Sequence, residues 1–128
     1  MPTSVLLIDD NPGHLDLIEG FLSTKDFAIR RETDGQAALK SLGKPPYPDL
    51  VMLDYMMPMT PGATVYERIR QNPDLKELPV IVLSAINQST VKEKIPPCAA
   101  TQFVTKPVDF RILDAAMRSL LGGKYPQK

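Results

Sequence analysis

Short apolar runs recur along the chain and are separated by stretches with helical periodicity. Three runs, at residues 5–8, 50–53 and 80–83, are rich in Val, Leu and Ile, and each is followed by Asp or Ser. Runs of this length that are apolar at every position are typical of strands buried on both faces of a parallel sheet. Weaker runs at residues 27–29 and 103–104 are expected to be strands nearer the edges.

Apolar residues at helical spacing fill the intervals between these runs. Four predicted helices have recognisable ends: one that begins near Pro12, one over residues 36–42 after Asp34, one over residues 62–71 before Asn72, and one after Asp109 that Gly122 ends in the left-handed conformation. A fifth is expected to begin near Ser89 and to end at Pro96 and Pro97. Five strands alternating with about five helices predict a doubly wound α/β domain with a five-stranded parallel sheet.

The composition narrows the class of protein. The chain has 128 residues, and its 15 basic residues equal its 15 acidic ones, so net charge attracts neither nucleic acid nor an anionic membrane. Its single cysteine, Cys98, suits a reducing compartment and is expected to be a small packed residue. No apolar run approaches the roughly 20 residues that span a bilayer, and no secretory signal is recognisable. We therefore expect one cytoplasmic domain over residues 1–128, without direct nucleic-acid or membrane binding.

The residues that follow the predicted strands are the candidates for chemistry, because ligands of such sheets bind beyond the carboxyl ends of the strands. They are Asp9 and Asp10 after the first strand, Asp54 after the third, Ser84 after the fourth and Lys106 after the fifth. Three carboxylates at one edge favour a hard cation such as Mg²⁺, with a raised pKa as the alternative. A lysine and a hydroxyl beside them suit a phosphoryl group in transfer, and one carboxylate is left to act as nucleophile.

Four motifs in fixed order carry a resemblance to a known family: Leu-Ile-Asp-Asp-Asn, Met-Leu-Asp-Tyr-Met-Met-Pro-Met-Thr-Pro-Gly, Leu-Ser-Ala and Phe-Val-Thr-Lys-Pro. Across residues 5–121 the chain resembles a response-regulator receiver domain of two-component signalling. The resemblance implies a flavodoxin-like fold with strand order 2-1-3-4-5, as in chemotaxis regulators, and Mg²⁺ as cofactor. It implies a single receiver domain, with no output domain in this chain.

The resemblance also implies a metal site and a phosphoacceptor. Asp54 takes the place of the phosphoacceptor, and Asp9 and Asp10 take the place of the acidic pair. Asp10 would bind the metal directly, whereas Asp9 would act through water or by balancing charge. Asp54 and the backbone carbonyl of Met56 would complete the protein ligands.

A switch is implied at the neighbouring strand ends. Ser84 and Lys106 take the places of the hydroxyl and the lysine that contact the phosphoryl group, and Phe103 that of the aromatic residue that swings inward as the hydroxyl moves. The bond between Lys106 and Pro107 is commonly cis in this family.

The mechanism implied is attack by Asp54 on a phosphohistidine of a sensor histidine kinase or a histidine phosphotransfer protein. Phosphorylation would then shift the conformation of a two-state surface near the fourth helix and fifth strand, and a downstream effector protein would bind this surface. Such a chain is not an enzyme in the ordinary sense, because it catalyses only its own phosphorylation and dephosphorylation. The cognate kinase, the output process and the question of a stand-alone or longer protein stay open.

Two other functions are compatible with parts of the pattern. One is a receiver-like interaction module that works without phosphorylation, although all five key positions are filled. The other is a haloacid-dehalogenase-like phosphatase, which needs a second acid where this chain has Met56. The side chains of Met56 and Ile86, each two residues beyond a key strand end, cannot orient water, and we therefore expect slow autodephosphorylation.

Two further features lie close to the acids in the sequence. His14 is expected to be exposed in the first helical turn and not to bind metal, because no second His or Cys supports such a site. The methionines around Asp54 could form a soft metal site, but packing is preferred; they are Met52, Met56, Met57 and Met59.

Overall fold

The five strands of the protein lie parallel in one sheet, in the order β2-β1-β3-β4-β5, which confirms the predicted α/β fold. The computed structural model describes residues 2–126. The strands are β1 (Ser4–Ile8), β2 (Ala28–Glu32), β3 (Leu50–Asp54), β4 (Val80–Ser84) and β5 (Thr101–Thr105). The helices are α1 (Pro12–Leu22), α2 (Gly35–Ser41), α3 (Gly62–Gln71), α4 (Gln88–Lys94) and α5 (Phe110–Leu121), with 3₁₀ turns at Ser23–Lys25 and Gly122–Lys124.

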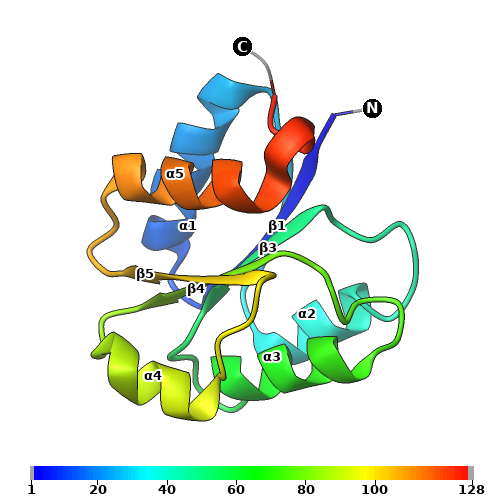
Figure 1. Cartoon of the computed structure of the whole chain (residues 1–128), viewed down its shortest axis with the longest axis vertical. Coiled ribbons are helices and arrows are strands. Elements are labelled where there is room, and N and C mark those ends of the chain that lie inside the picture. The colour runs from blue at the N-terminus through cyan, green and yellow to red at the C-terminus, as the bar shows by residue number, and fades with distance from the viewer. Residues whose placement is uncertain (1, 127–128) are drawn as a thin grey trace.

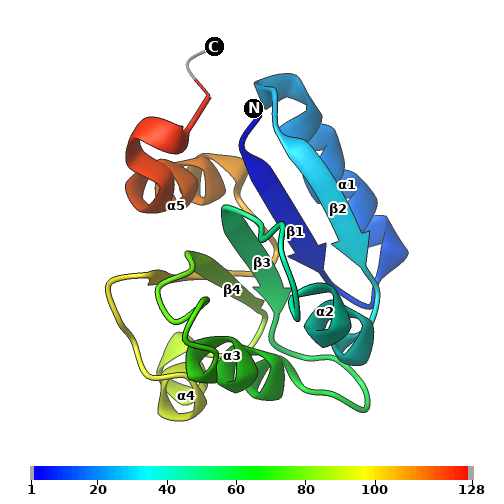
Figure 2. The same cartoon turned by 90° about the vertical axis from the view of Figure 1, so that its right-hand side faces the viewer.

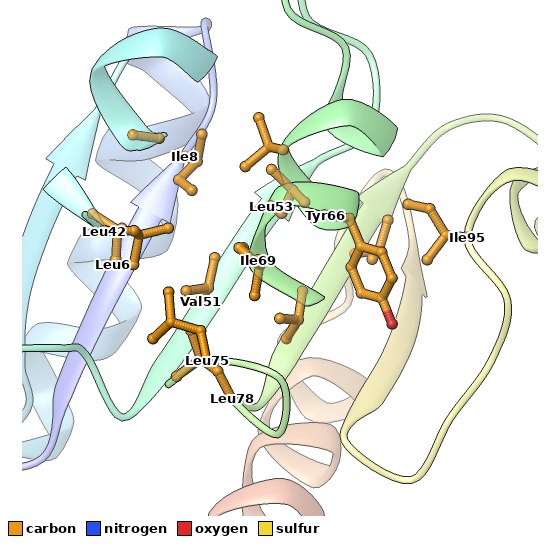
Figure 3. Close-up of a cluster of buried hydrophobic side chains, with 14 of the residues drawn as sticks. Leu6, Ile8, Leu42, Val51, Leu53, Tyr66, Ile69, Leu75, Leu78 and Ile95 are labelled. Carbon is orange, nitrogen blue, oxygen red and sulfur yellow. The ribbon is translucent and has the colours of Figure 1, made fainter. Parts of the chain in front are cut away.

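Helices cover both faces of the sheet. Helices α1 and α5 lie on one face, and α2, α3 and α4 lie on the other (Figures 1 and 2). Because side chains alternate along a strand, Leu6 of β1 packs in the cluster beneath α2 and α3, whereas Leu7 packs in the cluster beneath α1 and α5. Figure 3 shows the first cluster, in which Leu53 of β3 lies close to Ile69 of α3. Burial on both faces explains why the central strands are apolar at every position.

The edge strands differ most from the prediction. Strand β2 begins one residue later than the expected run at 27–29 and continues through Arg30, Arg31 and Glu32. Within the described residues it lies at the edge of the sheet and pairs with β1, so its side chains reach solvent and charged residues are tolerated there. Strand β5 likewise extends beyond residues 103–104 at both ends. The apolar pattern therefore underestimates the length of the strands at the sheet edges, where burial is incomplete.

The predicted helix ends are largely confirmed. The side chain of Asn11 accepts a hydrogen bond from His14 N, that of Asp34 accepts from Ala37 N, and that of Asp109 caps α5. Helix α4 ends before the two prolines, as expected. Gly122 ends α5 with a positive φ of 53°, as predicted, but its ψ of −122° differs from that of the left-handed helical conformation. The residue instead begins a 3₁₀ turn.

Two further findings concern single features of the described chain. Cys98 is exposed rather than packed, because it lies in the loop after α4. Within residues 2–126, no helix combines the length and the apolarity that crossing a membrane requires.

Candidate functional site

The three candidate aspartates lie together at the carboxyl ends of β1 and β3, which are neighbours in the centre of the sheet. One carboxylate oxygen from each of Asp9, Asp10 and Asp54 lies within 4.8 Å of the others. Asp9 and Asp54 are buried, whereas Asp10 is exposed. The sheet thus gathers two buried acids and one that faces solvent.

Lys106 connects β5 to this acidic group. Its Nζ lies 2.9 Å from Asp54 Oδ1 and 3.7 Å from Asp9 Oδ2. The backbone N–H of Lys106 donates to the carbonyl of Ser84 at 2.9 Å, which fixes the start of the loop after β5. The bond from Lys106 to Pro107 is cis. One ammonium group therefore balances part of the charge of two buried carboxylates.

The environment of Asp54 favours its protonated form. Burial raises the pKa of Asp54 to about 6, and the nearby charge of Asp9 acts in the same direction. The hydrogen bond from Lys106 and a weaker one from the N–H of Met56, at 3.4 Å, lower the pKa but do not cancel the effect of burial. An additional cation at this site would relieve the same repulsion.

The chemistry of the donor set fits a hard divalent cation. Three carboxylates converge, one of them open to solvent, and a hard cation such as Mg²⁺ binds oxygen ligands while it keeps several waters. Methionine sulfur contributes little here, because Met56 and Met59 point into solvent at 59% and 99% exposure. The packing expected for the methionines is found for Met52 and Met57 alone.

Asp9 is held by its neighbours on both carboxylate oxygens. Its Oδ1 accepts a hydrogen bond from the N–H of Asn11 at 2.9 Å. Its Oδ2 is hydrogen-bonded to Nδ1 of His14. The side chain of His14 is only 16% exposed, so the expectation of an exposed residue is wrong. The spacing of residues in the sequence does not reveal this contact, because it forms where the turn from β1 into α1 brings the imidazole of His14 back over the end of the strand.

The two expected switch residues lie on β4 and β5. Ser84 is buried, and its Oγ accepts a hydrogen bond from the N–H of Ile86 at 2.9 Å. Phe103 is half-buried against the cluster beneath α2 and α3. The Nζ of Lys92 lies 5.3 Å from the centre of its ring. Gln88 Nε2 also donates to the carbonyl of Phe103 at 3.3 Å and to the hydroxyl of Thr105 at 3.0 Å, so α4 contacts this strand through two of its side chains.

Gly62 ends the motif that contains Asp54, but the sequence analysis assigned it no role. Its N–H donates to the carbonyl of Tyr55 at 3.0 Å. A Cβ at this position would lie 2.4 Å from the carbonyl oxygen of Asp54 and 2.7 Å from Cα of Tyr55. The start of α3 therefore packs directly on the backbone that carries Asp54. The signal in the sequence is the glycine that follows Pro61 at the predicted helix start.

Comparison with known proteins gives a consistent assignment. A family model for the response regulator receiver domain matches residues 5–118. Response regulator PleD of Caulobacter vibrioides is 30% identical over 120 residues, which are 94% of this chain but only 26% of PleD, so the chain spans about a quarter of that protein. Two-component response regulator ORR5 of Oryza sativa is 32% identical over 104 residues, which are 81% of this chain and 78% of ORR5.

Solved structures agree with this comparison. A putative response regulator from Chloroflexus aurantiacus is 27% identical with a TM-score of 0.86, covering 94% of this chain and 98% of that one. The receiver domain of the Pseudomonas aeruginosa sensor histidine kinase PA1611, solved with a magnesium ion in its active site cleft, shares the fold at 22% identity and a TM-score of 0.80, covering 94% of this chain and 98% of that one. This chain therefore belongs to the response regulator receiver domain family of two-component systems, in which a phosphoacceptor role is the usual function.

Proposed function

We propose that Asp54 accepts a phosphoryl group from a phosphohistidine and that the domain thereby switches a protein-interaction surface. The observation that carries this proposal is the buried Asp54 carboxylate with Lys106 Nζ at 2.9 Å, next to the two other acids. A buried nucleophile with a fixed lysine and an adjacent cation site is what transfer to a carboxylate requires.

The hydrogen bonds at Asp54 indicate how its carboxylate would attack. Lys106 Nζ and the N–H of Met56 both donate to Oδ1, which leaves Oδ2 as the attacking oxygen. A bond forms from Oδ2 to phosphorus while the bond from phosphorus to the donor's histidine nitrogen breaks, and that nitrogen keeps the electron pair. Lys106 is placed to offset negative charge on the phosphoryl oxygens in the transition state. Hydrolysis of the acyl phosphate restores the carboxylate.

Asp10 and Asp54 would hold the cation directly, with the backbone carbonyl of Met56 as a further ligand, whereas Asp9 would act through water or by balancing charge. Mg²⁺ bound there would supply charge neutralisation for the transferring phosphoryl group. The exposed carboxylate of Asp10 suits a direct ligand, whereas both oxygens of Asp9 already have partners. Replacing Asp10 by Asn is therefore expected to weaken Mg²⁺ binding more than replacing Asp9 by Asn. Equal losses would contradict this division of roles.

The proposed output involves Ser84, Phe103 and the α4–β5 surface. Movement of the Ser84 hydroxyl toward a phosphoryl oxygen would open space for Phe103, which α4 contacts through Lys92 and Gln88. The phosphoryl donor would be a sensor histidine kinase or a histidine phosphotransfer protein, and the receptor of the signal a downstream effector protein. In this role the domain catalyses only its own phosphorylation and dephosphorylation.

Incubation with Mg²⁺ and phosphoramidate tests the proposal directly. The intact protein is expected to gain the mass of one phosphoryl group, and Asp54→Asn is expected to gain none. Asp74→Asn, at an exposed position in the loop before β4, is the matched control and should react like the native protein. A native protein that gains no mass would favour the phosphorylation-independent interaction module instead.

A further inference from the structure

His14 is the group next to the acidic site that the proposed mechanism does not use. It lies in the first turn of α1, where its own N–H donates to the side chain of Asn11 at 3.2 Å. This capping contact holds its backbone in place, and the ring is largely covered. The imidazole is therefore fixed against Asp9 Oδ2 rather than free in solvent.

The contacts of Asp9 show what this imidazole does. Its Oδ1 accepts from the N–H of Asn11, and its Oδ2 is shared between His14 Nδ1 and the more distant ammonium of Lys106, at 3.7 Å. Each hydrogen bond occupies one of the roughly four lone-pair sites of a carboxylate, so fewer sites of Asp9 remain for a cation. Asp10 has an exposed carboxylate that is open to a cation.

We infer that His14 is a positioning residue that keeps Asp9 from coordinating the metal directly and so leaves the cation to Asp10 and Asp54. In the described part of the chain, residues 2–126, the ligand atoms that cluster within 4.8 Å belong to the three aspartates, so the imidazole acts through Asp9 and not as a ligand itself. The inference rests on the metal site of the proposed function and assigns a new residue to it.

The test compares Mg²⁺ binding of His14 variants, measured as dissociation constants by amide NMR titration with magnesium chloride. His14→Phe keeps a ring of similar size and removes the hydrogen bond, which releases Oδ2 of Asp9 for the cation. We expect it to tighten Mg²⁺ binding, by about tenfold, because Asp9 Oδ2 can then bind the cation. If Asp9 were already a direct ligand, loss of its hydrogen-bond partner would instead weaken binding, commonly by about 10- to 100-fold. His14→Asn places an N–H donor on the atom next to Cγ, close to the position of Nδ1, and should restore native affinity. If the contact of His14 with Asp9 only held the site in shape, its loss would weaken Mg²⁺ binding instead of tightening it.

Double variants separate action through Asp9 from a general change of charge. The gain from His14→Phe is expected to disappear when Asp9→Asn is also present and to persist when Asp10→Asn is present. Unchanged or weaker Mg²⁺ binding by His14→Phe, or a gain that survives Asp9→Asn, would overturn the inference. His14→Leu serves as a second variant without the hydrogen bond, and amide spectra of each protein report whether it is folded.

The Mg²⁺-binding test of His14 gives its answer whether or not Asp54 accepts a phosphoryl group. If Asp54 takes up no phosphoryl group but the variants shift Mg²⁺ affinity as described, the proposed function fails and the role of His14 stands. If Asp54 is phosphorylated and His14→Phe does not tighten Mg²⁺ binding, the function stands and the role of His14 is overturned. A native protein that does not bind Mg²⁺ would overturn the role of His14 whatever its reaction with phosphoramidate.

Discussion

Asp54→Asn is expected to stabilise the metal-free protein at neutral pH. Burial raises the pKa of Asp54 from 3.8 to about 6, so over this interval the folded state holds a proton that the unfolded chain releases. The free energy of unfolding therefore falls as pH rises from about 4 through about 6, and the full cost is present at higher pH. Asparagine has nearly the same shape, still accepts a hydrogen bond from Lys106, and carries no charge to bury.

The size of this effect follows from the shift. Each pKa unit corresponds to about 1.4 kcal/mol, so a rise from 3.8 to about 6 sets a ceiling of about 3 kcal/mol on the cost of ionising Asp54 in the fold. The attraction of Lys106 is already contained in that shift. Because the neighbouring Asp10 is exposed, solvent screens part of the charge, so we expect a gain below this ceiling, about 1 to 2 kcal/mol.

Urea unfolding followed by far-ultraviolet circular dichroism measures the gain, in buffers with a chelator from about pH 4 to about pH 8. The difference between Asp54→Asn and the native protein should be largest above about pH 7 and vanish near pH 4. Adding Mg²⁺ should reduce it, because the cation stabilises the carboxylate alone. Equal stability of the two proteins above about pH 7, or a gain that grows toward low pH, would refute the reasoning.

Asp114→Asn provides a control of opposite sign. Burial raises the pKa of Asp114, but hydrogen bonds from Tyr125 and Arg118 outweigh burial and hold the pKa below its ordinary value. The ionised carboxylate of Asp114 therefore stabilises the fold above the pKa of the unfolded chain, and this stabilisation is lost as pH falls through the lower folded pKa. Asp114→Asn should destabilise the protein at neutral pH in the same unfolding experiment.

Three further predictions concern packing and the lifetime of the phosphorylated state. Gly62→Ala should lower the free energy of unfolding by about 1 to 3 kcal/mol, because its Cβ would press on backbone atoms. Gly20→Ala has open space around the new Cβ and should raise the free energy of unfolding by about 0.5 to 1 kcal/mol. Urea unfolding measures both changes. Arg70→Met should cost about 2 kcal/mol in the same assay, because the guanidinium donates to backbone carbonyls of two loops. Acyl phosphate on Asp54 should decay slowly when followed by mass spectrometry, since Met56 and Ile86 cannot orient water, and unassisted loss within seconds would contradict this.

Much of the fold was predictable because its signals are local. Central strands must be apolar at every position when helices cover both faces, and that requirement is visible in residues 5–8, 50–53 and 80–83. Capping at Asn11 and Asp34 involves residues a few positions apart, so spacing alone predicts it. The edge strand β2 was harder to predict, because half-exposed positions accept arginine as readily as isoleucine.

The residues that end the strands, and the family that their order indicates, can be read from the sequence alone. The parallel sheet places the carboxyl ends of its strands at one edge, so Asp9, Asp10, Asp54 and Lys106 could be expected there before any distance was known. Three features became visible only in the folded chain: the contact of His14 with Asp9, the raised pKa of Asp54 and the close approach of Gly62 to the Asp54 carbonyl. These depend on burial and on ångström-scale distances between segments, which the identity and spacing of residues do not specify.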